Sequence, residues 1–387
     1  MTTPRPVGPP ARPAHHRPAV TELRLSSYKS HRGAVFPLAP VTFFAGPSGS
    51  GKSNALDAYA SLARLASGAE LSEVFPDPAA CVPERAAPDS QGRRGFRIGC
   101  TVDGPAGPVR LDLAVQAEPE LRIVGERLTT EDQTLLSTAL RDPGRRSVQA
   151  AWFTGGNVGV TRAPLPDDRL GTALLPLRVA GSTAGQRHVL AAAEQLVVAL
   201  RAVFPCDPQP RSMRDPVPAG TGRLTGGCEN LAEILGRTRN ECVTRHAALI
   251  EAARTGCAGP VTDLSTQDLP DGRIRAVLGR GGDSTTPLGR LAEGELRFLA
   301  LALVLLTGPG VLAVDPAAEL LPAQQALTVL ADGLDRGLDD RQTAELLRLA
   351  LLCCARGHVR LAGTMGAGAA AGKAREVDGV SVVDLTV

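Results

Sequence analysis

The most informative stretch of this chain reads Gly46-Pro47-Ser48-Gly49-Ser50-Gly51-Lys52-Ser53. The stretch fits the pattern G-x-x-x-x-G-K-[ST] of a phosphate-binding loop, or P-loop, in full. Glycines let the backbone amides turn inward around phosphates, the lysine reaches the β- and γ-phosphates, and the serine hydroxyl coordinates magnesium. The pattern therefore predicts a site for ATP with Mg²⁺.

The residues on both sides give this loop the surroundings that a P-loop requires. The run before it, Val41-Thr42-Phe43-Phe44-Ala45, is apolar and uncharged, as in a strand buried on both faces. Apolar residues recur after it at three- and four-residue spacing, which predicts a helix to about Ala66. A strand, the loop and a helix in this order are the context in which the motif binds phosphate. Asn54, directly after Ser53, is expected at the same site.

Alternating apolar residues further along the chain predict an antiparallel meander. Every second residue is apolar from 96 to 102 and again from 109 to 115, and residues 121–124 would add a third strand. Residues 1–19 instead carry six prolines and show no periodicity, so we expect a disordered tail there.

The rest of the chain alternates between helical and strand patterns. The helices that we expect cover residues 188–204, 231–235, 243–254, 294–307, 322–334 and 341–356. The strands that we expect cover residues 273–279, 311–315, 358–364 and 380–387.

Composition excludes several classes of protein. A net charge of only +2 gives no overall field that favours nucleic acid or an anionic membrane. Eight cysteines at irregular spacing, with no CxxC pair, predict reduced and buried thiols, not a disulfide framework or a zinc site. The longest apolar run, residues 298–306, is too short to span a bilayer. We expect a cytoplasmic protein that does not associate with a membrane.

The P-loop and its neighbours resemble those of RecF/SMC-type ATPases, which belong to the ABC class. The resemblance extends to residues 25–33 and to Asn54-Ala55-Leu56-Asp57-Ala58. A second stretch, Leu291-Ala292-Glu293-Gly294-Glu295-Leu296-Arg297, is similar to the family's signature motif at the start of an apolar helix. The resemblance implies that two copies sandwich ATP, with Glu293 and Gly294 of one copy facing the γ-phosphate held by the other.

A third stretch resembles a Walker B strand: Val311-Leu312-Ala313-Val314-Asp315-Pro316. The family has two adjacent acids here, one for magnesium and one for the attacking water, but this chain has only Asp315. Counted from the apolar run, Asp315 is the magnesium acid and Pro316 replaces the catalytic glutamate. Counted back from the proline, Asp315 is the catalytic acid and Val314 has replaced the magnesium acid. Lys52 and Asp315 are thus the candidate catalytic residues, and Ser53 and Asp315 the candidate metal ligands.

Two more positions depart from the family pattern. Ala292 stands where a signature serine is usual, and Met365 where a switch histidine is usual. A lost hydrogen bond to phosphate costs roughly 1.5–3 kcal/mol. We therefore expect ATP to bind but hydrolysis to be slow or absent, so that ATP acts as a conformational ligand. No Q-loop glutamine is identifiable, and Tyr28, Lys29 and Arg32 are the candidates for adenine contacts.

The expected fold class is α/β: a P-loop NTPase of the ABC-type ATPase head kind, with an antiparallel β meander and an inserted, mainly helical subdomain. After the tail, residues 20–125 would form the N-terminal lobe of the ATPase with the P-loop. Residues 126–272 would form the inserted helical or irregular subdomain. Residues 273–387 would form the C-terminal lobe with the signature and Walker B-like motifs.

Three functions fit these observations. The first is a nucleotide-gated module for dimerisation or partner binding, with weak or absent hydrolysis. The second is an active ATPase that converts ATP and water to ADP and phosphate in DNA maintenance or phage defence, which the resemblance alone suggests. The third is a small-molecule P-loop kinase, which leaves the signature-like stretch unexplained. An ATP-dependent homodimer is the expected assembly; a protein partner and DNA are further candidates, and a membrane is not.

Overall fold

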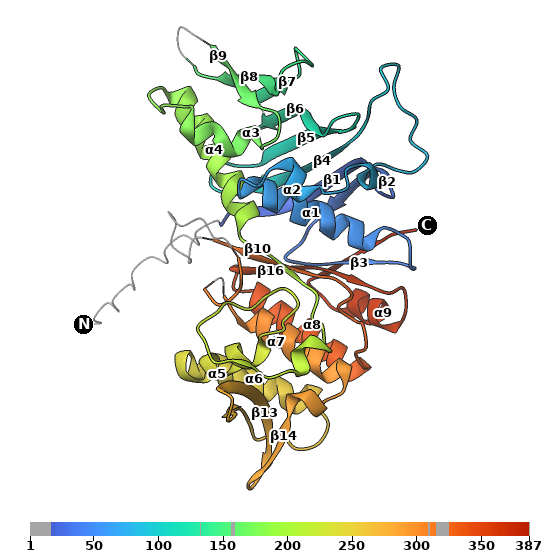
Figure 1. Cartoon of the computed structure of the whole chain (residues 1–387), viewed down its shortest axis with the longest axis vertical. Coiled ribbons are helices and arrows are strands. Elements are labelled where there is room, and N and C mark those ends of the chain that lie inside the picture. Colours follow the sequence, from blue (N-terminus) through green and yellow to red (C-terminus); the bar gives the residue numbers. More distant parts are fainter. Residues whose placement is uncertain (1–16, 132, 156–158, 309, 315–324, 387) are drawn as a thin grey trace, which may run out of the picture.

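The computed structural model describes residues 17–131, 133–155, 159–308, 310–314 and 325–386. Its strands form three sheets, which follow one another along the longest axis of the molecule (Figure 1). An antiparallel sheet lies at one end, a parallel sheet in the middle and a small sheet at the other end. The predicted mixed α/β class is confirmed.

The antiparallel sheet has the strand order β2-β1-β4-β5-β6-β7-β8-β9. Its members are β1 (Ala19–Tyr28), β2 (His31–Pro37), β4 (Arg94–Asp103), β5 (Val109–Glu118), β6 (Arg122–Thr129), β7 (Thr134–Ala139), β8 (Ser147–Phe153) and β9 (Val160–Pro166). The predicted meander is thus present as β4, β5 and β6. The sheet does not end at residue 125, however, because β7 to β9 extend it through a region predicted to be helical or irregular.

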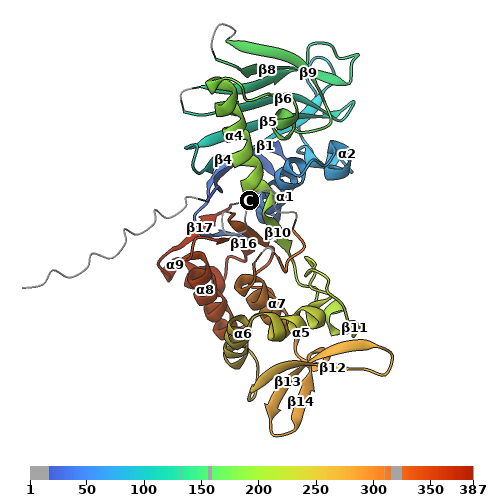
Figure 2. The ribbon, with the colours of Figure 1, turned by 90° about the vertical axis from the view of Figure 1, so that its left-hand side faces the viewer.

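Helices cover one face of this sheet. They are α1 (Lys52–Ala66), α2 (Leu71–Val74), α3 (Gly171–Leu174) and α4 (Ala184–Arg201). Helix α4 crosses β1, β4, β5 and β8 (Figure 2) and buries its apolar side against them. The alternating pattern explains this arrangement, since Phe96, Ile98, Cys100 and Val102 of β4 are all buried. The predicted helix 188–204 ends earlier, at Arg201, and its last residues belong to a strand.

The parallel sheet has the order β10-β15-β16-β3-β17. Its members are β3 (Val41–Ala45), β10 (Val203–Cys206), β15 (Leu327–Ala331), β16 (Val359–Met365) and β17 (Val380–Asp384). All residues of β3 and β15 are buried, which agrees with their uncharged, apolar sequences. Strand β16 pairs in parallel with both β15 and β3. The carboxyl ends of these three strands therefore lie at the same edge of the sheet.

Below this sheet lie the helices of the second half of the chain (Figure 1). They are α5 (Leu231–Glu241), α6 (Val243–Gly256), α7 (Glu293–Leu306), α8 (Asp340–Cys354) and α9 (Ala369–Glu376). Helix α7 packs between α6 and α8, so nearly all of its side chains are buried. The small sheet, which α5 covers, contains β11 (Val217–Pro218), β12 (Asp263–Asp268), β13 (Arg273–Gly281) and β14 (Ser284–Pro287).

Two predictions in the last third of the chain are wrong. Val311 and Leu312 do not belong to the parallel sheet; Leu312 forms only an isolated bridge with Leu224. Leu327–Ala331, predicted as part of a helix, is strand β15 between β10 and β16. Both runs are short and apolar, and periodicity cannot tell a buried strand from a buried helix over such a length. Asp315 and Pro316 lie outside the described residues.

Candidate functional site

The P-loop connects β3 to α1 and has the backbone that its glycines allow. Gly49 and Gly51 have φ values of +85° and +91°, in the left-handed region that disfavours other residues. A Cβ atom on Gly51 would also lie 2.4 Å from Ser30 Oγ and 2.8 Å from the His31 ring. The loop is therefore held in its curved shape by contact with the turn between β1 and β2. Pro47, Ser48 and Gly49 are exposed at its outer side.

The inside of this loop offers several groups that suit an anion. Lys52 Nζ curls back and donates hydrogen bonds to Gly46 O at 2.8 Å and Pro47 O at 2.7 Å. No side chain caps the N-terminus of α1, which leaves amides of its first turn available. Ser50 is buried, and its hydroxyl has no hydrogen-bond partner among the described residues. An ammonium, open amides and an unpaired hydroxyl in one loop fit a bound phosphate.

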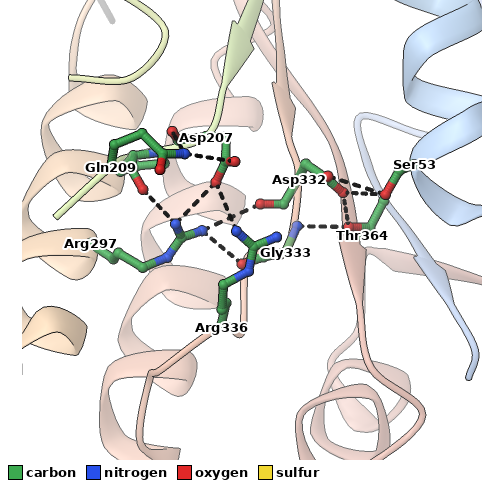
Figure 3. Close-up of polar contacts among 9 residues, drawn as sticks. Ser53, Asp207, Gln209, Arg297, Asp332, Gly333, Arg336 and Thr364 are labelled. Carbon is green, nitrogen blue, oxygen red and sulfur yellow. Dashed lines mark hydrogen bonds and ion pairs between the residues drawn. The ribbon is translucent and has the colours of Figure 1, made fainter. Parts of the chain in front are cut away.

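A carboxylate at the carboxyl end of the parallel sheet faces the P-loop serine (Figure 3). Ser53 Oγ lies 3.0 and 3.1 Å from the two carboxylate oxygens of Asp332, which follows β15. Thr364 of β16 donates to Asp332 Oδ1 at 2.6 Å and accepts from Gly333 N at 2.7 Å. A hydroxyl and a carboxylate are oxygen ligands of the kind that Mg²⁺ prefers. Within the described residues, no group of three or more His, Cys, Asp or Glu forms a metal site by itself.

Asp332 thus lies at the end of a buried strand beside Ser53, where the sequence analysis expected Asp315, a residue outside the described ones. The signal was present, because Leu327-Thr328-Val329-Leu330-Ala331-Asp332 is also an apolar run that ends in an acid. It was missed because the residues before it favour a helix and because no proline follows. Gly333 comes directly after Asp332, so the position next to this acid carries no carboxylate.

A buried arginine ties the carboxyl ends of β10 and β15 together. Arg297 of α7 is 3% exposed. Its guanidinium pairs with Asp207 Oδ1 at 3.0 Å and donates to Pro208 O at 2.6 Å, both just after β10. It also donates to Gly333 O at 2.9 Å and to Asp332 O at 3.3 Å (Figure 3). Helix α7 therefore supports the backbone on which Asp332 is presented.

These elements enclose a groove of about 600 Å³ beside the P-loop. Its polar lining residues are Lys29, Ser53, Asn54, Asp57, Asp207, Gln209 and Asp332. Gln209 follows β10 and donates to Asp207 Oδ2 at 2.9 Å, so the structure brings a glutamine to the groove that no sequence pattern identified. A second groove, of about 640 Å³, lies on the antiparallel sheet and is lined by none of the P-loop residues.

The three residues proposed for adenine contacts differ in their surroundings. Tyr28 is fully buried, and its hydroxyl lies 2.5 Å from Asp57 Oδ2. Burial, together with the Asp57 charge, raises the pKa of Tyr28 far above its ordinary value. Lys29 pairs with the same carboxylate at 2.6 Å, and Arg32 is exposed. Tyr28 is therefore a core residue and not a contact for adenine. Asn54 donates to Ser30 Oγ at 2.9 Å, which fastens α1 to the β1–β2 turn.

No family model and no curated protein matches the chain. Solved structures do. An SMC head bound to the C-terminal winged-helix domain of ScpA has a TM-score of 0.49 at 13% identity, with 90% of each chain covered. The SMC head domain from Thermotoga maritima has a TM-score of 0.44 at 15% identity, over 95% of this chain and 100% of that chain.

A third structure is an SMC head domain with an extended coiled coil, bound to the C-terminal domain of ScpA from Pyrococcus furiosus. It has a TM-score of 0.45 at 12% identity, over 90% of this chain and 89% of that chain. The chain is similar to these three SMC heads over most of its length, at TM-scores below 0.5. Identities this low concern the fold only and transfer no site residue.

The signature-like stretch begins α7, as predicted. Ala292 is the N-cap, and Glu293 is exposed in the first turn. Glu295 accepts hydrogen bonds from Ala292 N at 2.9 Å and from Ala258 N at 2.7 Å, so its charge is engaged inside the chain. A Cβ atom on Gly294 would lie 2.1 Å from Gly337 O. Packing within one chain thus requires this glycine, whatever it does toward a second copy.

The P-loop and the signature-like stretch do not meet within one chain. Among the described residues, no hydrogen bond or ion pair joins residues 46–53 to residues 291–295. At the end of β16, Met365 stands where a switch histidine was sought, and it is 1% exposed. His358 precedes the opposite end of the same strand. No described helix is long and apolar enough to cross a bilayer.

Proposed function

We propose that this chain binds ATP with Mg²⁺ at the P-loop and uses it as a conformational ligand. The observation that carries the proposal is the pairing of Ser53 with Asp332, beside a loop whose amides and lysine suit phosphate. In the bound state, Lys52 would leave Gly46 O and Pro47 O for the terminal phosphates. The unpaired hydroxyl of Ser50 would gain a phosphate oxygen.

Ser53 and Asp332 are the proposed magnesium ligands. The cation would take a place between the Ser53 hydroxyl and the Asp332 carboxylate, which now bond to each other directly. Magnesium usually keeps several waters and binds proteins through one or two oxygen groups plus the substrate phosphates. The donor set of one hydroxyl and one carboxylate, with Gln209 in the same groove, fits this mode of coordination. Bound Mg²⁺ would neutralise phosphate charge that the single lysine cannot.

Hydrolysis is proposed to be slow or absent. In the family that the sequence resembles, a carboxylate directly after the magnesium acid orients the attacking water, but the residue after Asp332 is Gly333. Asp335, the next acid, is engaged, because its Oδ2 accepts from Gly366 N at 2.9 Å. Ala292 and Met365 remove a phosphate contact and a histidine at two other positions of the pattern. Within the described residues, the groups suited to bind ATP are thus kept, and no carboxylate follows Asp332 directly.

Calorimetric titration tests the binding. Wild-type protein with Mg²⁺ should bind ATP, and Lys52→Ala should weaken binding roughly 10- to 100-fold because it removes a charge-assisted contact to phosphate. Lys373→Ala is the matched control, since Lys373 lies on α9 and pairs with Asp340 at 3.0 Å. Wild-type protein that releases no heat with ATP would refute the proposal. So would equal binding by the Lys52 variant.

Release of labelled phosphate tests the second part. We expect turnover no faster than that of Lys52→Ala. Robust turnover that the Lys52 substitution abolishes would show an active ATPase and contradict the conformational role.

ATP-dependent dimerisation is the proposed consequence of binding. The signature-like start of α7 does not reach the P-loop of its own chain, so a second copy would have to supply it. Size-exclusion chromatography with light scattering should give a monomer without nucleotide and a dimer with ATP and Mg²⁺. A monomer under both conditions would contradict this consequence and leave ATP binding itself unaffected.

A further inference from the structure

A tight turn directly after Asp332 presents an arginine beside the groove. Arg336 N donates to Gly333 O at 3.0 Å and closes the turn. The turn is fastened at both ends, by Gly333 N to Thr364 Oγ1 at 2.7 Å and by Gly366 N to Asp335 Oδ2 at 2.9 Å. The backbone of Arg336 is therefore fixed relative to Asp332, while its side chain is 56% exposed.

The guanidinium of Arg336 lies across Gly333. A Cβ atom built on Gly333 would be 2.8 Å from Nη2, 3.0 Å from Nε and 3.1 Å from Cζ of Arg336. Gly333 also has a φ of +59°, which a glycine adopts easily. The cation thus occupies the space of the side chain that would otherwise follow the magnesium acid. The position after Asp332 carries positive charge from Arg336 in place of a carboxylate.

The present partner of Arg336 is one that it can leave. Its Nη1 lies 3.4 Å from Asp207 Oδ1, a long and partly exposed ion pair of the kind that contributes little. The same Asp207 oxygen holds the buried guanidinium of Arg297 at 3.0 Å. Because Arg297 would remain, departure of Arg336 would not leave Asp207 without a cation. Asp207 itself lines the groove together with Ser53 and Asp332.

We propose that Arg336 senses the γ-phosphate: when ATP binds, its guanidinium leaves Asp207 and pairs with the terminal phosphate. The inference rests on the ATP binding proposed above. ATP places one more phosphate than ADP next to the magnesium ligands Ser53 and Asp332, and Arg336 is attached four residues after Asp332. A guanidinium forks two hydrogen bonds to a phosphate, which a long ion pair to one carboxylate oxygen does not provide. Arg336 would therefore make the site prefer ATP over ADP.

Paired titrations of ADP and a non-hydrolysable ATP analogue, both with Mg²⁺, test this inference. Arg336→Ala should bind the analogue about tenfold more weakly than wild type, and ADP within about twofold. Arg336→Lys keeps the charge but cannot form the two parallel hydrogen bonds of a guanidinium. Its affinity for the analogue should therefore lie between those of wild type and Arg336→Ala. Arg341→Ala is the matched control, because Arg341 begins α8, is 52% exposed and has a comparable long ion pair to Asp339 at 3.8 Å.

The outcomes separate the two proposals. Arg336→Ala that binds both nucleotides like wild type, or that loses both equally, overturns the sensor and leaves ATP binding standing. Wild-type protein that binds neither nucleotide, or Lys52→Ala that binds both normally, overturns ATP binding and the sensor with it. Thermal unfolding midpoints equal to that of wild type must accompany each variant, since the exposed Arg336 should matter little for stability.

Discussion

At the scale of single residues, Asp332 is held by hydrogen bonds from three other elements. Its carboxylate accepts hydrogen bonds from Ser53 on α1 and Thr364 on β16, and its carbonyl accepts one from Arg297 on α7. Each partner comes from a different element: two of the contacts orient the carboxylate, and the third holds the backbone from which it projects. Support of this kind would orient Asp332 for the magnesium that we propose it binds.

Substitution of that carboxylate should affect magnesium more than nucleotide. Asp332→Asn keeps the shape and loses the charge, so we expect ATP affinity measured with Mg²⁺ to fall roughly 10- to 100-fold. Affinity measured in a chelator should change little, because Lys52 and the loop amides remain. Asp340→Asn, on the exposed start of α8, serves as the control. Equal weakening with and without Mg²⁺ would argue against a role as metal ligand.

At the scale of elements, α7 connects the ends of two strands to the turn that carries Arg336. Its start packs on that turn through Gly294 and Gly337, and its next helical turn places Arg297 between β10 and β15. A displacement at the start of α7 would therefore also shift the backbone of Asp332. The sequence resemblance assigned Gly294 to a contact with a second copy, whereas the structure gives it a packing role within one chain.

Gly294→Ala should destabilise the chain even without nucleotide or partner. The new methyl carbon would lie 2.1 Å from Gly337 O, so backbone must shift. Overpacking of this kind costs about 1–3 kcal/mol in the free energy of unfolding, which denaturant melts can measure. Gly372→Ala on α9 is the matched control, because nothing lies within 4 Å of its Cβ position. It should be neutral or slightly stabilising. If Gly294→Ala were as stable as wild type, packing within one chain would not explain the glycine, and contact with a second copy would be the better explanation.

At the scale of the whole molecule, the site lies where two hydrophobic cores meet. One core fills the space between the antiparallel sheet and α1 and α4, and the other surrounds α7 and α8. Strand β3 contributes to both, since Phe44 belongs to the first core and Phe43 to the second. The P-loop at the end of β3 is thus supported from both sides, and the groove beside it is lined by residues of both halves.

The same burial protects the cysteines. All eight are free and seven are buried, while Cys242 alone is half-exposed. Burial raises the pKa values of Cys100, Cys257 and Cys354 to about 12, so roughly one in a thousand of these thiols is ionised at pH 9. A thiolate-selective reagent should therefore label native protein once at pH 9, and Cys242→Ser should abolish that label. Rapid labelling of several cysteines without denaturant would contradict the packing described.

Some of this molecule follows from local sequence. The P-loop, its strand and its helix were predictable because phosphate binding is written into eight consecutive residues, and backbone propensity acts over the same short range. The strands of the meander and the helices α7 and α8 were predictable for a similar reason, since their apolar spacing is regular.

The rest of the site was decided by tertiary structure. Asp332 and Gln209 line one groove with Ser53 of the P-loop only because parallel strands far apart in the sequence end at the same edge of one sheet. Two short apolar runs, each followed by an acid, are equivalent as sequence. Only one of them, residues 327–331, finds neighbours in β10 and β16 that can pair its backbone. Strand pairing is a long-range interaction, and so the local sequence did not show which of the two runs joins the parallel sheet.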